Sequence, residues 1–301
     1  MYAGGYARRA FAFAPPENLR IFLERHSLLH ELSLNEPLAT TLNILFIGDI
    51  IGQPGLEMTT TLFKSLIEKH RIDFCIANGE NLTDGKGISE EDSKKVFGLG
   101  VHVITSGNHV WDRWDSRKVL GGNRYILRPL NYPRENGGNG FVVFDLNEST
   151  KIGVINLQGR TYMQPIDDPF KTIDWAVSKV NEQTKICIID FHAEATAEKM
   201  ALGWYVDGRV SAVVGTHTHT PTADARILPR GTAFITDVGM SGPYDSVIGM
   251  KKEQAVSRFL KQTPHKYETA VNDVHLCAVV ISVEAETGKA LSIEQVIFPK
   301  F

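Results

Sequence analysis

The sequence predicts an α/β fold built on a parallel sheet, and three observations support this prediction. Short apolar runs at 44–47, 74–77 and 101–104 are typical of buried strands. Apolar residues at helical spacing follow the first run over 54–70, and a second helix is expected near 89–98, after the second run. Each strand then ends in a glycine flanked by Asp, Glu, Asn or His. This alternation is typical of parallel sheets, which place their ligands at the carboxyl ends of the strands.

The two helices carry their own start signals. Pro54 suits the first turn of a helix, where its missing N–H is not needed, so the first helix is expected over 54–70. Ser89 precedes three acidic residues, a combination that caps a helix and complements its dipole. The second helix is therefore expected to begin at about residue 89.

The second half of the chain adds a further set of strands. The runs 141–146 and 151–157 are separated by turn residues and are expected to be neighbours. The run 185–191 leads directly into His192. We also expect strands near 210–215, 224–228, 233–237, 275–283 and 292–298, and helices near 169–183, 194–204 and 251–261. One domain over 42–301 is the simplest assignment, because strand ends from both halves carry side chains that suit one site.

The composition is that of an ordinary globular protein. The 301 residues are 43% hydrophobic and 22% charged, with a formal net charge of −3. This weak negative charge argues against a broad basic face for long nucleic acids, but it does not exclude a small nucleotide substrate. No run approaches the ~20 apolar residues of a membrane span, so no membrane partner is expected.

Two further features concern the setting of the domain. The three cysteines, Cys75, Cys187 and Cys277, lie far apart in apolar runs, which favours buried free thiols in a reducing compartment and a cytoplasmic protein. Residues 1–41 are expected to form an extension that adds nothing to catalysis. Their first 16 residues resemble a transit segment in composition, and 17–33 have the spacing of a short amphipathic helix.

The polar strand ends supply candidate metal ligands. Asp49 and Glu80 each follow a glycine, and Asn81 and Asn108 stand at the second and third strand ends. Taken singly, such residues often cap helices or form turns. Their occurrence in order on consecutive strand ends favours a shared site. Oxygen ligands combined with imidazoles suit Mn, Fe or Zn.

Histidines complete the candidate set. His217 and His219 are separated by one residue, so in an extended chain both side chains point the same way and reach one metal or two adjacent metals. Such pairs also occur on exposed strands without a metal. His192 follows its own strand, where a simple hydrogen-bonding role is the alternative.

These motifs resemble the five ordered motifs of the calcineurin-like metallophosphoesterases. The matching segments are Gly48-Asp49, Gly79-Glu80-Asn81, Gly107-Asn108-His109, His192 and Gly215-Thr216-His217-Thr218-His219. The first motif departs from the usual Asp-x-His and the second from the usual Gly-Asp. Both departures, together with segments 235–249 and 156–160, resemble the bacterial YmdB-type phosphodiesterases. The resemblance covers residues 43 to about 298 and implies an α/β/β/α sandwich of two central mixed sheets flanked by helices.

The resemblance also implies a dinuclear centre. Asp49, Glu80, Asn81 and His219 would hold one divalent ion, and Glu80, Asn108, His192 and His217 the other. Iron or manganese is expected, with zinc and magnesium as alternatives. Two adjacent ions activate a water and neutralise phosphate charge in such enzymes. The implied activity is hydrolysis of 2′,3′-cyclic nucleotides, with some action on 3′,5′-cyclic ones.

Two more side chains are candidates for the chemistry. His109 stands beside Asn108 and would protonate the leaving oxygen; a hydrogen bond to a metal ligand is its alternative role. Asp112 and Trp111 follow His109 and would orient it, unless Trp111 belongs to the core. Arg160 would contact substrate phosphate, because a guanidinium matches phosphate oxygens in pairs, unless it forms a surface salt bridge.

Two rival functions use the same residues. A phosphomonoesterase or nucleotidase would need the same metals, since mono- and diesters differ only in the space and leaving group beside the phosphate. A metal-holding regulator that binds nucleotide, RNA or a protein is the non-catalytic alternative. Family resemblance also leads us to expect a homo-oligomer.

Overall fold

Two six-stranded mixed sheets form the centre of the computed structural model, which describes residues 40–264, 266 and 268–301. The first sheet has the order β10-β11-β1-β2-β3, with β12 paired to β11. Its strands are β1 (Thr41–Ile47), β2 (Phe74–Asn78), β3 (Val103–Thr105), β10 (Gly242–Pro243), β11 (Val274–Glu284) and β12 (Ala290–Phe298). As predicted, β1, β2 and β3 run parallel.

The second sheet has the order β4-β5-β6-β7-β9-β8. Its strands are β4 (Phe141–Asp145), β5 (Lys151–Gln158), β6 (Cys187–His192), β7 (Ala212–Thr216), β8 (Arg226–Ile227) and β9 (Ala233–Ile235). The inner four, β5, β6, β7 and β9, are parallel, whereas β4 and β8 close the two edges in the antiparallel direction.

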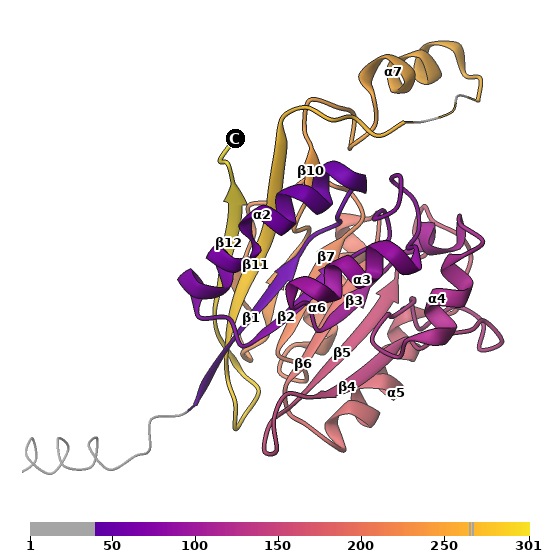
Figure 1. Cartoon of the computed structure of the whole chain (residues 1–301). Coiled ribbons are helices and arrows are strands. Elements are labelled where there is room, and N and C mark those ends of the chain that lie inside the picture. The colour runs from indigo at the N-terminus through magenta and orange to yellow at the C-terminus, as the bar shows by residue number, and fades with distance from the viewer. Residues whose placement is uncertain (1–39, 265, 267) are drawn as a thin grey trace, which may run out of the picture. The chain divides into compact units, whose positions relative to one another are not determined.

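Helices cover the outer face of each sheet (Figure 1). The first sheet packs against α2 (Gly52–His70) and α3 (Glu90–Leu99), and the second against α5 (Pro169–Asn181) and α6 (Thr196–Val206). A third apolar cluster fills the space between the sheets. The result is four layers in the order α/β/β/α, which confirms the fold expected from the resemblance.

Strand β1 shows why its run 44–47 is apolar throughout. Ile44 and Phe46 face the second sheet, while Leu45 and Ile47 face α2 and α3. Successive side chains of a strand point to opposite faces, and here both faces are covered. A continuous apolar run is therefore what a central strand of this sandwich requires.

Some element boundaries differ from the predicted ones. The first helix begins at Gly52 rather than Pro54, and the third strand spans Val103–Thr105 rather than 101–104. Val101 is buried without belonging to the strand, because an apolar pattern reports burial and not backbone pairing. The capping role of Ser89 is confirmed, since its hydroxyl accepts a hydrogen bond from the Asp92 N–H at 3.1 Å.

Several short elements were not predicted. They are the 3-10 helix η1 (Asn108–Trp111), the helix α4 (Ser116–Gly122) and the two-residue strand β10. The predicted helix near 251–261 is α7 (Lys252–Lys261). The extension and its expected helix over 17–33 lie outside the described residues. Among the helices that the structure describes, none is long and apolar enough to cross a membrane.

Candidate metal centre

The carboxyl ends of strands from both sheets meet at one place. Asp49 follows β1, Glu80 and Asn81 follow β2, and Asn108 opens η1 after β3. His192 ends β6, and His217 and His219 follow β7. Buried polar contacts join the sheets here: the Asn78 amide donates to Asp190 Oδ2 at 2.8 Å, and Asn156 exchanges two hydrogen bonds with the backbone of Ser106. These contacts fix the two sets of strand ends against each other.

Two groups of side chains in this region have the geometry of metal ligands. One consists of Glu80, His192 and His217, and the other of Asp49, Glu80 and His219. Within each group the ligand atoms lie within 4.8 Å of one another. Glu80 belongs to both groups, so its carboxylate stands between two potential ion positions.

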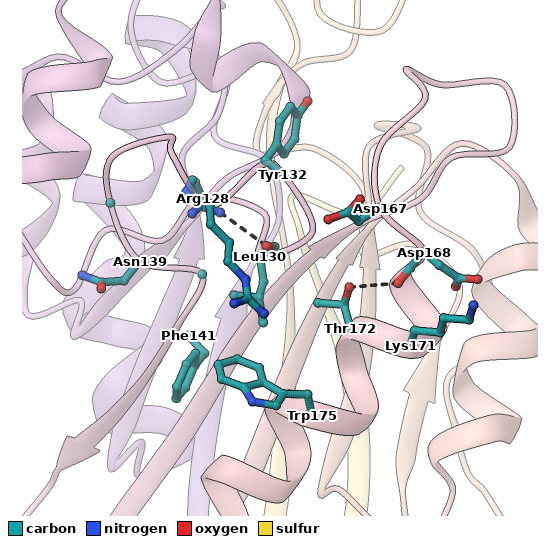
Figure 2. Close-up of a pocket in the computed structure, with 13 residues that line it drawn as sticks. Arg128, Leu130, Tyr132, Asn139, Phe141, Asp167, Asp168, Lys171, Thr172 and Trp175 are labelled. Atoms are coloured by element: carbon teal, nitrogen blue, oxygen red, sulfur yellow. Dashed lines mark hydrogen bonds between the residues drawn. The ribbon is translucent and has the colours of Figure 1, made fainter.

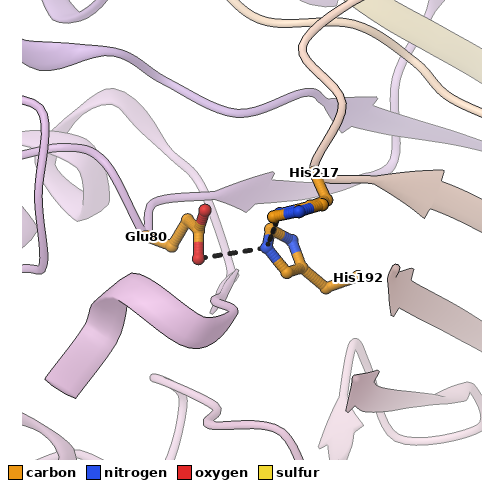
Figure 3. A group of neighbouring side chains, drawn as sticks. All are labelled: Glu80, His192 and His217. Atoms are coloured by element: carbon orange, nitrogen blue, oxygen red, sulfur yellow. Dashed lines mark hydrogen bonds and ion pairs between the residues drawn. The ribbon is translucent and has the colours of Figure 1, made fainter. Parts of the chain in front are cut away.

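The first group converges on one atom (Figure 3). His192 Nε2 lies 3.1 Å from Glu80 Oε2, 3.0 Å from His217 Nδ1 and 3.1 Å from Asn108 Oδ1. These four atoms carry lone pairs that face a common point. Such an arrangement needs a proton or a cation between them, because lone pairs at these distances otherwise repel.

The remaining nitrogen of each histidine has its own acceptor. His192 Nδ1 lies 2.9 Å from the Thr216 hydroxyl, which in turn donates to Asp190 Oδ1. His219 Nδ1 donates to the carbonyl of Ile248 at 2.8 Å. These contacts place the ring proton on the outer nitrogen and direct the lone pair of the other nitrogen inward, as in protein metal sites.

His217 also has one ring nitrogen that contacts an acceptor and one that faces the site, but here the outer nitrogen is Nε2. Its Nε2 lies 3.2 Å from Glu194 Oε2, so Nδ1 is the nitrogen left for an ion. No role was assigned to Glu194 from the sequence, and Ile248 was included only within the motif 235–249. Glu194 lies two residues beyond His192. An acidic residue so close to a candidate metal ligand was the feature of the sequence that could have pointed to it.

Unpartnered buried oxygens provide an independent test of whether a metal fits. Among the described residues, Asp49 Oδ1, Glu80 Oε1 and Asn81 Oδ1 have no hydrogen-bond donor. Leaving a buried acceptor unsatisfied costs about 1–3 kcal/mol, and more for a charged group. Three such oxygens, together with inward-facing imidazole lone pairs, are the donor set of a cation. The residues present therefore fit two metal ions.

The electrostatics of the cluster reflect strong mutual interactions. Burial by itself would lower the pKa of His192, but Glu80, Asp49 and Asp190 outweigh it and raise this pKa to about 9. Burial would raise the pKa of Glu80, but His192 and the neighbouring histidines hold it well below its usual range. Burial lowers the pKa of His217 to about 3. A charged carboxylate and a neutral His217 are the forms that bind metals.

The extended backbone expected for His217 and His219 is not observed. Strand β7 ends at Thr216, and the two histidines have φ values of 99° and 64°. Residues other than glycine seldom adopt such angles, so the loop needs support. Asp237 Oδ2 provides it by accepting hydrogen bonds from the backbone N–H and the hydroxyl of Thr218 at 3.0 and 2.8 Å. The two imidazoles thus reach the site through a strained turn and not through strand alternation.

Gly107 shows why a glycine precedes a ligand in this site. A Cβ atom at this position would lie 2.2 Å from His192 Nε2 and 2.4 Å from Glu80 Oε2. No side chain fits there without moving both ligands. The backbone of η1 therefore passes directly against the cluster, and the His109 N–H donates to Glu80 Oε2 at 3.1 Å.

His109 lies at the rim of the cluster. Its side chain is 35% exposed, and its Nδ1 lies 2.9 Å from Asp112 Oδ2. This contact leaves Nε2 free to donate or accept a proton. As expected from the sequence, Asp112 orients the ring, whereas Trp111 packs against Tyr132 with ring centroids 5.3 Å apart.

Arg160 forms a surface salt bridge, the alternative role considered for it. Its guanidinium pairs with Asp168 at 2.9 Å, and its side chain is 48% exposed. Its backbone N–H donates to Glu198 Oε1 at 3.1 Å. The residue lies just after β5, whose last residue Gln158 pairs in register with His192. Its contact with a substrate stays a prediction.

Known proteins resemble this chain over most of its length. The model of the YmdB-like protein family matches residues 45–296. The 2′,3′-cyclic-nucleotide 2′-phosphodiesterase of Bacillus subtilis is 45% identical over 256 residues, which cover 85% of this chain and 97% of the relative. A solved structure from Thermus thermophilus, of a hypothetical protein, superposes with a TM-score of 0.80 at 37% identity, covering 85% of this chain and 99% of that one. A novel phosphatase of Mycoplasma pneumoniae gives a TM-score of 0.81 at 34% identity, covering 87% and 94% of the two chains.

Proposed function

The chain belongs to the YmdB-like protein family, and from this premise we propose that it is a metal-dependent phosphodiesterase that hydrolyses 2′,3′-cyclic nucleotides. The family assignment and the relative from Bacillus subtilis support the reaction class. The observation that carries the metal dependence is the set of three unpartnered buried oxygens, on Asp49, Glu80 and Asn81, beside three imidazoles whose outer nitrogens are all engaged.

We assign the ligands as the resemblance implies. Asp49, Glu80, Asn81 and His219 would hold one ion, and Glu80, Asn108, His192 and His217 the other. Two divalent ions held there would supply positive charge for the phosphate oxygens and would lower the pKa of a water near them. Iron or manganese suits this mixture of carboxylate, amide and imidazole donors.

His109 is proposed as the general acid. Opening a 2′,3′-cyclic phosphate at the 2′ position adds a water to phosphorus, breaks the P–O2′ bond and requires one proton on the departing 2′ oxygen. The Asp112 carboxylate holds the ring through Nδ1, and Nε2 would donate that proton. The position of His109 at the exposed rim of the cluster suits contact with substrate.

Phosphomonoester hydrolysis is the second candidate, because the similar protein of Mycoplasma pneumoniae is described as a phosphatase. The two activities are separated by assaying the purified protein, with and without Mn²⁺, on four substrates. These are 2′,3′-cAMP, 3′,5′-cAMP, bis-p-nitrophenyl phosphate and p-nitrophenyl phosphate. We expect hydrolysis of the diesters with about two metals bound per chain. Activity confined to the monoester would replace the proposal by the second candidate, and full metal without any hydrolysis would leave the regulatory alternative.

The cellular setting follows from the cysteines. Cys75, Cys187 and Cys277 are buried free thiols on β2, β6 and β11. Buried unpaired cysteines fit a reducing compartment, and we therefore propose the cytoplasm.

A further inference from the structure

A groove lies at the β4 edge of the second sheet. Its volume is about 750 Å³, within the range of small-ligand sites. Figure 2 shows Arg128 and Asn139 on one side, Asp167, Lys171 and Thr172 on the other, Tyr132 at one end, and Phe141 and Trp175 at the opposite end. None of the proposed metal-binding residues lines this groove.

The groove combines aromatic surfaces with cationic groups. Trp175 is 48% exposed and meets Phe141 edge to face, with ring centroids 5.6 Å apart. Half-exposed aromatic rings in a groove provide a surface on which a planar group can stack. Any of the nucleobases can stack in this way, because each has a flat aromatic face.

Arg128 is a buried cation on the wall of this groove. It is only 5% exposed. Its guanidinium donates hydrogen bonds to the carbonyls of Pro129, Leu130 and Asn136. Its Nε has no acceptor, and no carboxylate pairs with it in the described part of the chain. A buried guanidinium without a carboxylate leaves positive charge on the groove wall.

Two more cations line the groove. Across residues 40–264, 266 and 268–301, the side chains of Arg134 and Lys171 form neither an ion pair nor a hydrogen bond. Of the two acids present, Asp168 is already paired with Arg160 and caps α5, so only Asp167 offsets the three cations. The groove is therefore suited to an anion attached to a planar ring.

Tyr132 connects the groove to the metal centre in two ways. Its hydroxyl donates to Gln158 Oε1 at 2.9 Å, and Gln158 lies opposite His192 in the β5–β6 ladder, about 4.8 Å away. Its ring also packs on Trp111, in the same 3-10 helix that carries Asn108 and His109. The groove thus begins one strand away from a proposed metal ligand.

We propose that this groove binds the nucleotide that precedes a terminal 2′,3′-cyclic phosphate, so that short oligonucleotides with cyclic ends are substrates. Trp175 stacks on the base of that nucleotide, and Arg134 and Lys171 contact its phosphate. Such ends are the products of RNA cleavage by internal attack of a 2′ hydroxyl, and that class of reaction would supply them. The inference rests on the proposed function, because the cyclic phosphate must occupy the metal centre.

The test compares 2′,3′-cAMP with the dinucleotide ApA bearing a 2′,3′-cyclic phosphate, using the full-length metal-loaded protein. For Trp175→Ala we expect kcat/KM on the dinucleotide to fall about 5- to 150-fold, the loss expected for one stacked base, while kcat/KM on 2′,3′-cAMP is unchanged. The double substitution of Arg134 and Lys171 by Ala should also raise KM for the dinucleotide only. Trp204→Ala, at a 52% exposed tryptophan on α6 outside the groove, is the matched control.

The outcomes separate the two proposals. A wild-type protein that hydrolyses neither substrate overturns the proposed function, whatever the groove does. Wild-type activity on both substrates, with equal effects of the groove variants on each, overturns the subsite alone. A change in oligomeric state for Trp175→Ala in size-exclusion chromatography, without a selective loss on the dinucleotide, would assign the groove to a subunit interface instead.

Discussion

The buried Lys199 ammonium lies 2.6 Å from Asp237 Oδ2, the carboxylate oxygen that also accepts the two hydrogen bonds from Thr218. Both partners are nearly inaccessible, with exposures of 1% and 0%. Asp237 Oδ1 accepts a further hydrogen bond from the Gly239 N–H at 2.8 Å. One ion pair therefore supports the turn that carries His217 and His219.

Replacing one partner should destabilise the protein strongly. Lys199→Met leaves Asp237 buried without its counter-ion, so we expect the free energy of unfolding to fall by about 3–5 kcal/mol, measured by urea denaturation. Bound metal per chain should fall as well, because the turn loses its support. Lys94→Met, at an exposed ion pair on α3, is the control and should change stability by less than about 1 kcal/mol. Equal stability of the two variants would contradict a supporting role for the pair.

Gly107→Ala should empty the centre while the fold remains. The new methyl group would overlap His192 and Glu80, so we expect a large loss of bound metal in elemental analysis, with little change in the circular dichroism spectrum. Gly98→Ala is the matched control, because a Cβ on this α3 glycine meets no atom within 4 Å. The control should keep its metal and gain up to about 1 kcal/mol of stability. Full metal content in Gly107→Ala would show that the ligands tolerate displacement.

His109→Ala should lower kcat on 2′,3′-cAMP by about 10²–10⁴-fold, the usual contribution of a general acid. Bound metal should be kept, because only the backbone N–H of His109 contacts Glu80. Asp112→Asn should give a smaller loss, since it weakens the hydrogen bond that orients the ring. An unchanged kcat in His109→Ala would exclude this residue as the acid.

Metal removal should make stability depend on pH in a defined direction. The pKa of His192 is raised to about 9 in the metal-free cluster, chiefly because Glu80 outweighs the effect of burial. Its contribution is therefore fully present below about pH 6.5, the unfolded value, and is lost as the pH rises through 9. We expect the Tm of chelated protein to fall between pH 7 and 9, and addition of Mn²⁺ to remove most of this fall. In His192→Gln the fall should be smaller; an identical slope would assign the dependence to another group.

Arg160→Ala should separate substrate contact from stability. The Arg160–Asp168 pair is exposed, so its loss should change the free energy of unfolding by at most about 1 kcal/mol. If the guanidinium contacts substrate, KM rises several-fold while kcat is unchanged. Asp168→Asn is the control, because asparagine still caps α5 and leaves Arg160 unpaired. An unaltered KM in Arg160→Ala would limit this residue to its salt bridge.

Local patterns in the chain were enough to predict the parallel core and the order of the candidate ligands. Continuous apolar runs mark strands that are covered on both faces, and a polar residue after such a run must lie at the carboxyl end of the strand. Asp49, Glu80 and His192 were found in this way, because their placement depends on local pattern alone. Gly107 was visible as a motif, although its close approach to His192 was not.

How these residues face one another depends on contacts between segments that are distant in the chain. The conformation of His217 and His219 depends on Asp237 and Lys199, which are remote in sequence, and the sheets are aligned by the contact between Asn78 and Asp190. The groove likewise joins residues of β4, α5 and the loop before β4. Hydrogen bonds and ion pairs between distant segments leave no periodic trace in the chain, because each depends on the packing of two complete sheets.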